Sequence, residues 1–249
     1  MTKVAFRKLS KAFRQRREGL DVLEEIDLSV ESGEFVCLLG PSGCGKSTLL
    51  NIAGGFEAPD SGWVEIDGQP VRGPDPRRVF VFQEYGIFPW ATVAENVALG
   101  LHGKPRPEKE RIVRHYVELV GLTGFESSYP SELSGGMKQR VALARALAVS
   151  PDIIFMDEPL GALDSLTRLQ MRGEILRIWQ QERPTILFVT HDVDEAIQLA
   201  DRVVVLTPRP ARIAEILTVG LAHPRDLGSP EYGRIRRQLY EALRVEYTV

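Results

Sequence analysis

Two stretches of the sequence contain residues that are suited to holding a phosphate group. The first is GPSGCGKS, in which Gly40 is followed by four residues and then by Gly45, Lys46 and Ser47. In this pattern the lysine reaches the β- and γ-phosphates of a nucleotide, and the serine hydroxyl binds Mg²⁺. A glycine-rich loop that leads into a helix also directs backbone N–H groups and the positive end of the helix dipole at an anion. The pattern predicts a nucleotide site made by Gly40, Pro41, Ser42, Gly43, Cys44, Gly45, Lys46, Ser47 and Thr48.

The second stretch is LSGGMKQR, in which Ser134, Gly135 and Gly136 are expected to open another helix. A single nucleotide site does not need two such phosphate caps from one chain. The duplication is explained if two copies face each other head to tail. Each nucleotide then lies between the loop of one copy and the Ser-Gly-Gly turn of the other. We therefore expect a nucleotide-dependent homodimer.

Two carboxylates follow the apolar strand that is expected over residues 153–156. Asp157 and Glu158 would lie at its carboxyl end, beside the phosphate loop. We expect Asp157 to face Mg²⁺ through water and Glu158 to orient the water that attacks the γ-phosphorus, since phosphoryl transfer depends mainly on positioning and charge. Without the phosphate loop, a solvated turn at the end of a strand would be the preferred interpretation.

His191 also follows an apolar strand, which is expected over residues 185–190, and it precedes a helix. A lone histidine is more often structural. Its place at the carboxyl end of a strand, near the same crevice, favours contact with the γ-phosphate.

The hydrophobic pattern indicates which elements position these residues. The expected strands of the first half are Val4 to Leu9, Leu28 to Val30, Glu34 to Leu39, Trp63 to Ile66 and Val79 to Phe82. Residues 92–149 have helical periodicity. After Pro151 strands and helices alternate, which implies a mostly parallel sheet. A further strand over residues 212–219 and a last helix over residues 232–245 complete the pattern.

Composition limits the class of protein. The chain has 249 residues, of which 43% are hydrophobic and 26% charged, and its formal net charge is −3. This charge argues against a general nucleic-acid binder. The sequence shows no apolar run long enough for a membrane span and no signal peptide, so we expect a cytosolic chain. The two cysteines do not suggest a disulfide, and Cys44 near a helix start is a candidate reactive thiol.

The motifs occur in the order found in ABC transporter ATP-binding subunits, which the chain resembles from about Val4 to Val219. They are GPSGCGKS, Gln83, LSGGMKQR, IIFMDEP, the Gly161 to Asp164 turn and His191. The resemblance implies that ATP and Mg²⁺ are bound and that Phe13 stacks on adenine. It also implies that Gln83 senses Mg²⁺ and the γ-phosphate, and that Asp164 links the two nucleotide sites. Residues 134–136 would clamp the ATP of the partner.

The same resemblance implies the fold and its division. We expect an α/β fold, namely the P-loop NTPase fold of ABC ATPases, with a mixed sheet core, an antiparallel β subdomain and an inserted helical subdomain. A single ATPase domain would cover residues 1–220, with core and β subdomain in 1–84 and 150–220 and the helical subdomain in 85–149. Residues 221–249 would form a C-terminal helical tail.

Two further segments resemble the branch of the family that takes up nitrate, sulfonates and taurine. They are Gly86 to Trp90 and Thr207 to Ile213. This resemblance implies an ATP-hydrolysing importer subunit at the cytoplasmic face of the inner membrane. Its partners would be a second copy, two integral membrane permease subunits and, indirectly, a solute-binding protein. Residues 85–90 would lie near the permease, with core packing as the alternative for Phe88 and Trp90.

Other functions remain open at this point. The chain could belong to an importer for a different class of solute. It could be an ABC-type ATPase that acts on DNA ends or ribosomes, although the long coiled-coil insertions or tandem cassettes of such proteins are not visible. It could also bind nucleotide only as a signal. The intact Lys46, Ser134, Glu158 and His191 argue against that reading.

Overall fold

The structure of the chain is a computed structural model that describes residues 1–15, 18–82 and 84–244. The chain forms two compact units. The first consists of Met1–Asp75 and Thr185–Val249, and the second of Pro76–Pro184. Each unit contains some of the candidate site residues that the sequence predicts.

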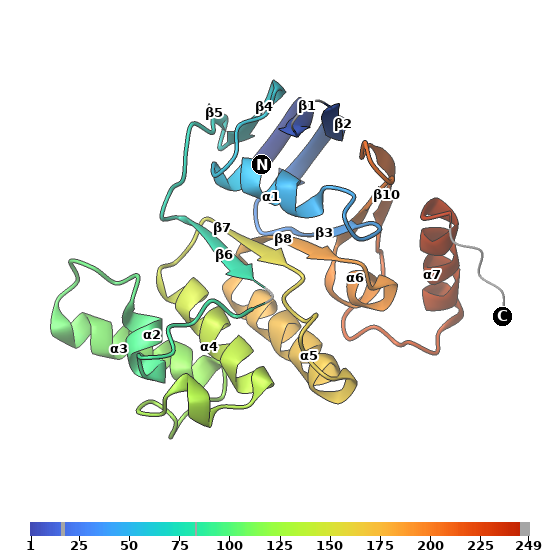
Figure 1. Cartoon of the computed structure of the whole chain (residues 1–249). Coiled ribbons are helices and arrows are strands. Elements are labelled where there is room, and N and C mark those ends of the chain that lie inside the picture. Colours follow the sequence, from blue (N-terminus) through green and yellow to red (C-terminus); the bar gives the residue numbers. More distant parts are fainter. Residues whose placement is uncertain (16–17, 83, 245–249) are drawn as a thin grey trace. The chain divides into compact units, whose positions relative to one another are not determined.

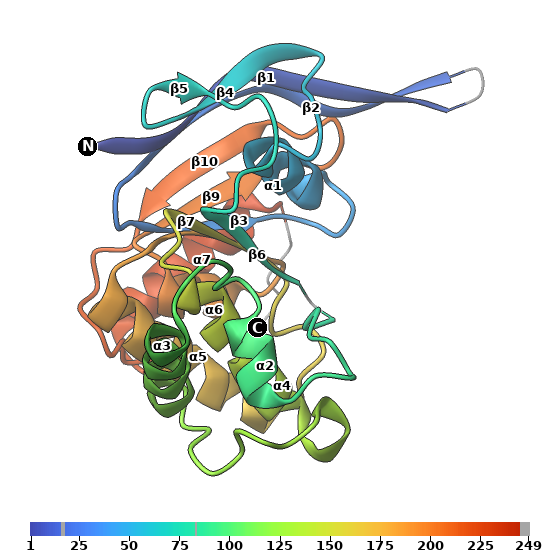
Figure 2. The ribbon, with the colours of Figure 1, turned by 90° about the vertical axis from the view of Figure 1, so that its left-hand side faces the viewer.

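An antiparallel sheet forms the N-terminal part of the first unit. Its strands are β1 (Thr2–Gln15), β2 (Glu18–Glu31), β4 (Ser61–Ile66) and β5 (Gln69–Pro70), in the order β2-β1-β4-β5. Figure 2 shows β1 and β2 side by side as a long ribbon. Their pairing contains bulges, at which Lys8 and Glu25 adopt positive φ. The freed N–H of Glu25 donates to the Ser10 hydroxyl over 3.0 Å, so the bulge leaves no open donor there.

A mixed sheet forms the other part of the first unit. Its strands are β3 (Phe35–Leu39), β8 (Thr185–Thr190), β9 (Arg202–Leu206) and β10 (Ile213–Thr218). β3 pairs in parallel with β8 and β9, and β10 pairs antiparallel with β9. Every residue of β3 and β8 is buried, as expected for parallel strands that are covered on both faces. The parallel pairing brings the carboxyl ends of β3 and β8 to the same edge of the sheet.

Three helices belong to the first unit, namely α1 (Lys46–Gly54), α6 (Val193–Leu199) and α7 (Pro230–Ala242). Figure 1 shows α7 beside α6 at the C-terminal end of the chain. The Tyr232 hydroxyl donates to Asp194 over 2.9 Å, and the guanidinium of Arg225 donates to the carbonyl of Ala200 over 2.8 Å. Burial lowers the pKa of Arg225 to about 10. These contacts attach the C-terminal segment to α6.

The second unit contains a parallel pair of strands and most of the helices. The strands are β6 (Arg78–Phe82) and β7 (Ile153–Asp157). The helices are α2 (Val93–Ala98), α3 (Arg106–Leu119), α4 (Gly135–Ala148) and α5 (Ser165–Glu182), with a short 3-10 turn η1 (Pro130–Glu132). α2, α3 and α4 pack on one another, and α4 also packs on β6 and α5. A capping box of Thr92 and Glu95 starts α2.

The predicted elements agree with this arrangement in type and order, and the expected mixed sheet, antiparallel sheet and helices are all present. The ends differ where backbone pairing, rather than apolar side chains, continues a strand. β1 and β2 extend well beyond the predicted segments 4–9 and 28–30, because they hold each other in a hairpin. The last helix ends at Ala242, and Val245 lies outside the described residues. None of the described helices has the length and apolar character needed to cross a membrane.

Gly62 in β4 tests how tightly the antiparallel sheet is packed. A Cβ there would lie 2.2 Å from the carbonyl oxygen of Arg7, and its φ is +71°. Gly68 has nearly the same φ, +70°, with nothing within 4 Å of a Cβ. We expect Gly62→Ala to lower the free energy of unfolding by about 1–3 kcal/mol more than Gly68→Ala, because only Gly62 adds a clash to the backbone strain. Urea unfolding followed by circular dichroism measures the difference, and equal losses would contradict this account of the packing.

Candidate active site

The phosphate-binding stretch forms a loop between β3 and α1 in the first unit. Pro41, Ser42 and Gly43 at its tip are exposed. α1 begins after Gly45, and none of the described side chains caps its first turn. The backbone N–H groups at this helix start are therefore left for an anion. This is the strand, loop and helix order that the sequence predicts.

Residues of β2 and the end of β9 pack closely against this loop. A Cβ on Gly45 would lie 2.8 Å from Val22 and 2.9 Å from Leu23 of β2. The φ of Gly45 is also +122°, which L side chains rarely adopt. A Cβ on Gly40 would lie 3.1 Å from the carbonyl oxygen of Leu206 at the end of β9. Glycine is therefore required at Gly45, and a side chain at Gly40 would fit only if its neighbours shifted by a few tenths of an ångström.

Lys46 lies along this loop. Its ammonium group donates to the carbonyl oxygens of Gly40 and Pro41 over 2.8 and 3.0 Å. The residue is only 4% exposed. An ammonium group has three donors, so these two bonds leave one for a phosphate oxygen. Ser47, the predicted Mg²⁺ ligand, is exposed in the next position.

His191 lies in the same unit, at the carboxyl end of β8, and is exposed. The turn that carries it is fixed by polar groups. The Thr190 hydroxyl donates to Glu195 over 2.6 Å and accepts from the Asp192 N–H over 3.0 Å. The Asp192 carboxylate in turn accepts from the Glu195 N–H over 2.9 Å. Thr190 and Glu195 are almost fully buried, so they hold the histidine turn rigidly.

A pocket of about 410 Å³ brings His191 together with the start of the phosphate loop. Gly40, Pro41 and residues 191–194 line it, and Tyr240 and Leu243 at the end of α7 complete it. The sequence therefore predicted correctly that His191 lies near the phosphate loop. It did not predict that the last helix reaches the same place.

The two predicted acids lie in the second unit, at the carboxyl end of β7. Asp157 is the last residue of this strand, and both Asp157 and Glu158 are half-buried. Glu158 adopts φ +44°, in the left-handed region that is unfavourable for a residue with a side chain. Strained conformations of this kind cluster at functional sites. The strained backbone therefore marks Glu158 as a candidate functional residue.

The second phosphate-holding stretch opens α4 in the same unit. The Ser134 hydroxyl caps the helix by accepting from the Met137 N–H over 3.3 Å. A Cβ on Gly136 would lie 2.7 Å from Thr167, and one on Gly135 would lie 3.1 Å from the Tyr85 hydroxyl. Gly136 is thus packed more closely than a Cβ allows without a shift of Thr167, and Gly135 is packed tightly. Ser134 remains exposed at this helix start.

Asp164 caps α5 in the second unit. Its carboxylate accepts from the N–H groups of Leu166 and Thr167 over 3.1 and 3.0 Å. These bonds, led by that of Thr167, hold the pKa of Asp164 below its ordinary value. The carboxylate is therefore ionised at neutral pH, and it is exposed to solvent.

The two cysteines are less accessible than the sequence suggests. Cys37 and Cys44 are both buried free thiols. Burial raises the pKa of Cys44, although the positive charges of Lys46 and Arg209 oppose the shift. The expectation of a reactive thiol was wrong, because desolvation outweighs the helix start and the nearby cations.

Two other predicted residues have different outcomes. Phe13 is 37% exposed, and the Lys11 ammonium lies 5.1 Å from its ring centre, so part of the ring is open to a stacking partner. Gln83 lies outside the described residues. Thr190 and Glu195 were missed by sequence reasoning, although the D-x-x-E spacing after an apolar strand is a recognisable helix start.

A glycine-rich loop of this form, between a buried strand and a helix, defines a P-loop nucleotide-binding protein. Comparison with known proteins narrows the class. A family model for the ABC transporter matches residues 23–161. The chain is 48% identical to an uncharacterized ABC transporter ATP-binding protein of Methanocaldococcus jannaschii, over 98% of this chain and 92% of that protein. The chain therefore belongs to the ABC transporter family, and it is an ATPase subunit of that family.

Other relatives have more specific names. A nitrate import ATP-binding protein of Synechococcus elongatus is 45% identical over 94% of this chain and 89% of its own length. An aliphatic sulfonates import ATP-binding protein of Bacillus cereus is 44% identical over 96% and 94%. A solved dimeric ATP-binding cassette with ADP and Pi has a TM-score of 0.75 and 30% identity, and it covers 88% of this chain and 100% of the solved chain. The family predicted from the motifs is confirmed.

Proposed function

We propose that this chain is the ATP-hydrolysing subunit of an importer for nitrate, sulfonates, taurine or a similar small solute. The observation that carries the proposal is the phosphate loop, in which exposed N–H donors and a buried lysine converge between β3 and α1. The names of the nitrate and sulfonate relatives support the solute class. The Thr207 to Ile213 and Gly86 to Trp90 segments support the same branch.

ATP would bind with its phosphates in the loop formed by residues 40–48 and with its adenine on Phe13. The chemistry of the donors fits Mg²⁺, because the Ser47 hydroxyl, the Asp157 carboxylate and the Gln83 amide oxygen are the hard oxygen ligands that this ion prefers. Bound Mg²⁺ would neutralise charge on the β- and γ-phosphates. The remaining N–H of the Lys46 ammonium group would donate to the same phosphate oxygens.

Hydrolysis would depend on Glu158. Its carboxylate would orient the attacking water and accept a proton from it, while His191 contacts the γ-phosphate. Gln83 would report the presence of Mg²⁺ and the γ-phosphate. The strained backbone at Glu158 and the hydrogen-bonded turn at His191 support these roles, since both backbone turns are formed without a ligand.

The second copy of the chain would complete each site. Ser134, Gly135 and Gly136 would present the start of α4 to the ATP of the partner, and Asp164 would link the two sites. The dimer of the solved ATP-binding cassette supports a dimeric state. The exposed Ser134 and Asp164 support a role for these residues in trans.

Two integral membrane permease subunits would be the other partners, with a solute-binding protein acting through them at the cytoplasmic inner membrane. Trp90 is 73% exposed, and its ring lies 5.1 Å from that of Phe88. Core packing therefore does not explain Trp90. A pocket of about 520 Å³ in the same unit, between α2 and α3, is lined by Ala94, Ala98 and Val113 together with charged residues of both signs. An exposed tryptophan is a common anchor of protein interfaces.

The predicted division of the chain belongs to the same proposal. Residues 1–84 and 150–220 would bind nucleotide, residues 85–149 would contact the permease, and residues 221–249 would form a tail. The contact of α7 with the pocket beside His191 gives this tail a place next to the nucleotide.

The first test is the substitution Glu158→Gln. We expect it to retain ATP binding and to lower kcat by at least about 100-fold, because only the carboxylate that positions water is lost. ATP should then hold the protein as a dimer in size-exclusion chromatography. Glu118→Gln, on the exposed face of α3, removes the same charge from the same unit and should leave kcat unchanged. Hydrolysis at the wild-type rate by Glu158→Gln would refute the assignment.

The second test addresses transport. A strain that lacks this chain should fail to grow on at least one of nitrate as sole nitrogen source and taurine or an alkanesulfonate as sole sulfur source. The wild-type gene should restore growth, and the Glu158→Gln gene should not. Normal growth of the deletion strain on all three at limiting concentrations would count against the proposed solute class.

A further inference from the structure

A second element contacts the phosphate loop besides the strand and helix that form it. The segment between β9 and β10, residues 207–212, follows Leu206, whose carbonyl oxygen lies against Gly40. The guanidinium of Arg209 in this segment lies 3.8 Å from the position of a Cβ on Gly43. A cationic side chain that is remote in sequence therefore stands beside the tip of the phosphate loop.

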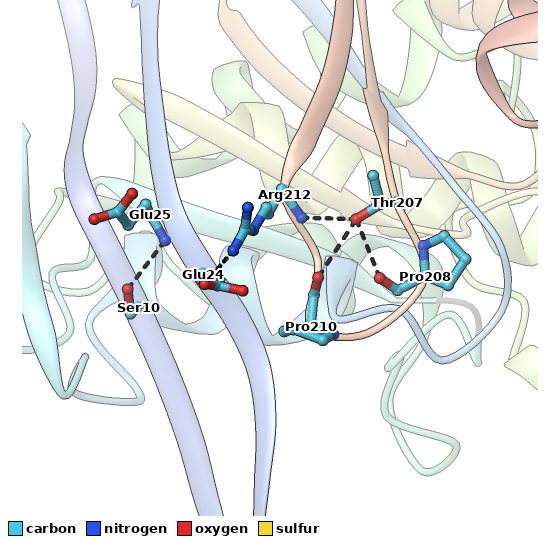
Figure 3. A network of polar contacts seen from close by, with 7 residues as sticks. All are labelled: Ser10, Glu24, Glu25, Thr207, Pro208, Pro210 and Arg212. Carbon is cyan, nitrogen blue, oxygen red and sulfur yellow. Dashed lines mark hydrogen bonds and ion pairs between the residues drawn. The ribbon is translucent and has the colours of Figure 1, made fainter.

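This segment is held in place by its own hydrogen bonds (Figure 3). The Thr207 hydroxyl accepts from the Arg212 N–H over 2.9 Å. The same hydroxyl lies 3.1 Å from the carbonyl oxygen of Pro208 and 3.4 Å from that of Pro210. Three groups of the turn thus converge on one side chain. The turn is compact and presents Arg209 from a fixed backbone.

The segment is also tied to β2, the strand that packs against Gly45. Ala211 donates its N–H to the carbonyl of Val22 over 2.8 Å and accepts from the N–H of Glu24 over 2.9 Å. The Arg212 guanidinium forms an ion pair with the Glu24 carboxylate (Figure 3). β2 and the 207–212 segment therefore support the phosphate loop as one assembly.

The two arginines of this segment have different surroundings. Arg212 is compensated by Glu24. Arg209 is exposed, and across residues 1–15, 18–82 and 84–244 it forms no ion pair. Its positive charge also acts on the phosphate loop. Burial raises the pKa of the Cys44 thiol, and the charges of Lys46 and, to a smaller extent, Arg209 oppose that shift. An uncompensated cation next to an anion-binding loop favours ligands of high negative charge.

We propose that Arg209 is a further nucleotide-binding residue, which strengthens the binding of the polyphosphate by its charge beside Gly43. The proposal rests on the nucleotide site proposed above. Because the interaction is electrostatic and solvent-exposed, it is modest, it grows with the charge of the ligand, and it weakens as salt is added. It also gives the Thr207 to Ile213 segment a direct effect on nucleotide affinity.

The test is equilibrium binding of ATP, ADP and AMP to the isolated chain, at protein concentrations below dimer formation. We expect Arg209→Gln to weaken ATP binding about fivefold at low ionic strength, ADP binding less, and AMP binding least. Arg209→Lys keeps the charge and should bind ATP nearly as wild type does. The loss in Arg209→Gln should shrink severalfold at about 0.5 M salt, since screening is then stronger. Arg72→Gln, which removes an exposed arginine elsewhere in the first unit, should change nothing.

Three results would overturn the proposal. Wild-type affinity of Arg209→Gln for ATP at low salt would show that the charge does not act on the nucleotide. An equal loss for ATP, ADP and AMP that does not depend on salt would show that Arg209 only supports the loop. A defect that appears only in dimer formation would assign the arginine to the partner chain. If the wild-type chain itself failed to bind ATP, the proposed function would fail instead, so the two outcomes are distinguishable.

Discussion

The close packing around the phosphate loop is the constraint on which the rest of the structure depends. Gly45 has no room for a side chain because Val22 and Leu23 of β2 lie against it, and Gly40 is packed tightly by the end of β9. The loop is therefore shaped by the fold before any nucleotide arrives. N–H donors that are already oriented bind and stabilise phosphate without a further loss of conformational freedom. β2, β9 and the 207–212 segment matter for function because they impose this shape.

The same principle operates at the second phosphate-holding stretch, in the other unit. Gly135 and Gly136 are packed closely there, because Tyr85 and Thr167 approach the backbone at the start of α4. Each chain thus presents two glycine-containing helix starts, and each is packed closely by side chains or backbone of its own unit. In a composite site shared between two copies, both helix starts would bind the same nucleotide. In the proposed arrangement, closure of the dimer would require ATP, and hydrolysis would release it.

Much of the site follows from local sequence, and what does not follow has physical reasons. The phosphate loop, the acids after β7 and His191 were predicted because each depends on a few neighbouring residues and on the strand before it. The clamp of Thr190 and Glu195 was missed because a buried hydrogen bond leaves little hydrophobic signal. The placement of Arg209 beside Gly43 joins distant parts of the chain and cannot be predicted from any local pattern. Cys44 was misjudged because burial cannot be read from its neighbours in the sequence.

The central claim is that each ATPase site is built from two chains, and mixing two inactive variants tests it most directly. Glu158→Gln lacks the water-orienting acid, and Ser134→Arg blocks the turn offered to the partner. In a mixed dimer, one site combines Glu158 of the Ser134→Arg chain with Ser134 of the Glu158→Gln chain, so it is intact. The measurement is the ATPase rate of the equimolar mixture. A rate well above that of either variant alone is predicted, and a mixture as inactive as its components would contradict the shared site.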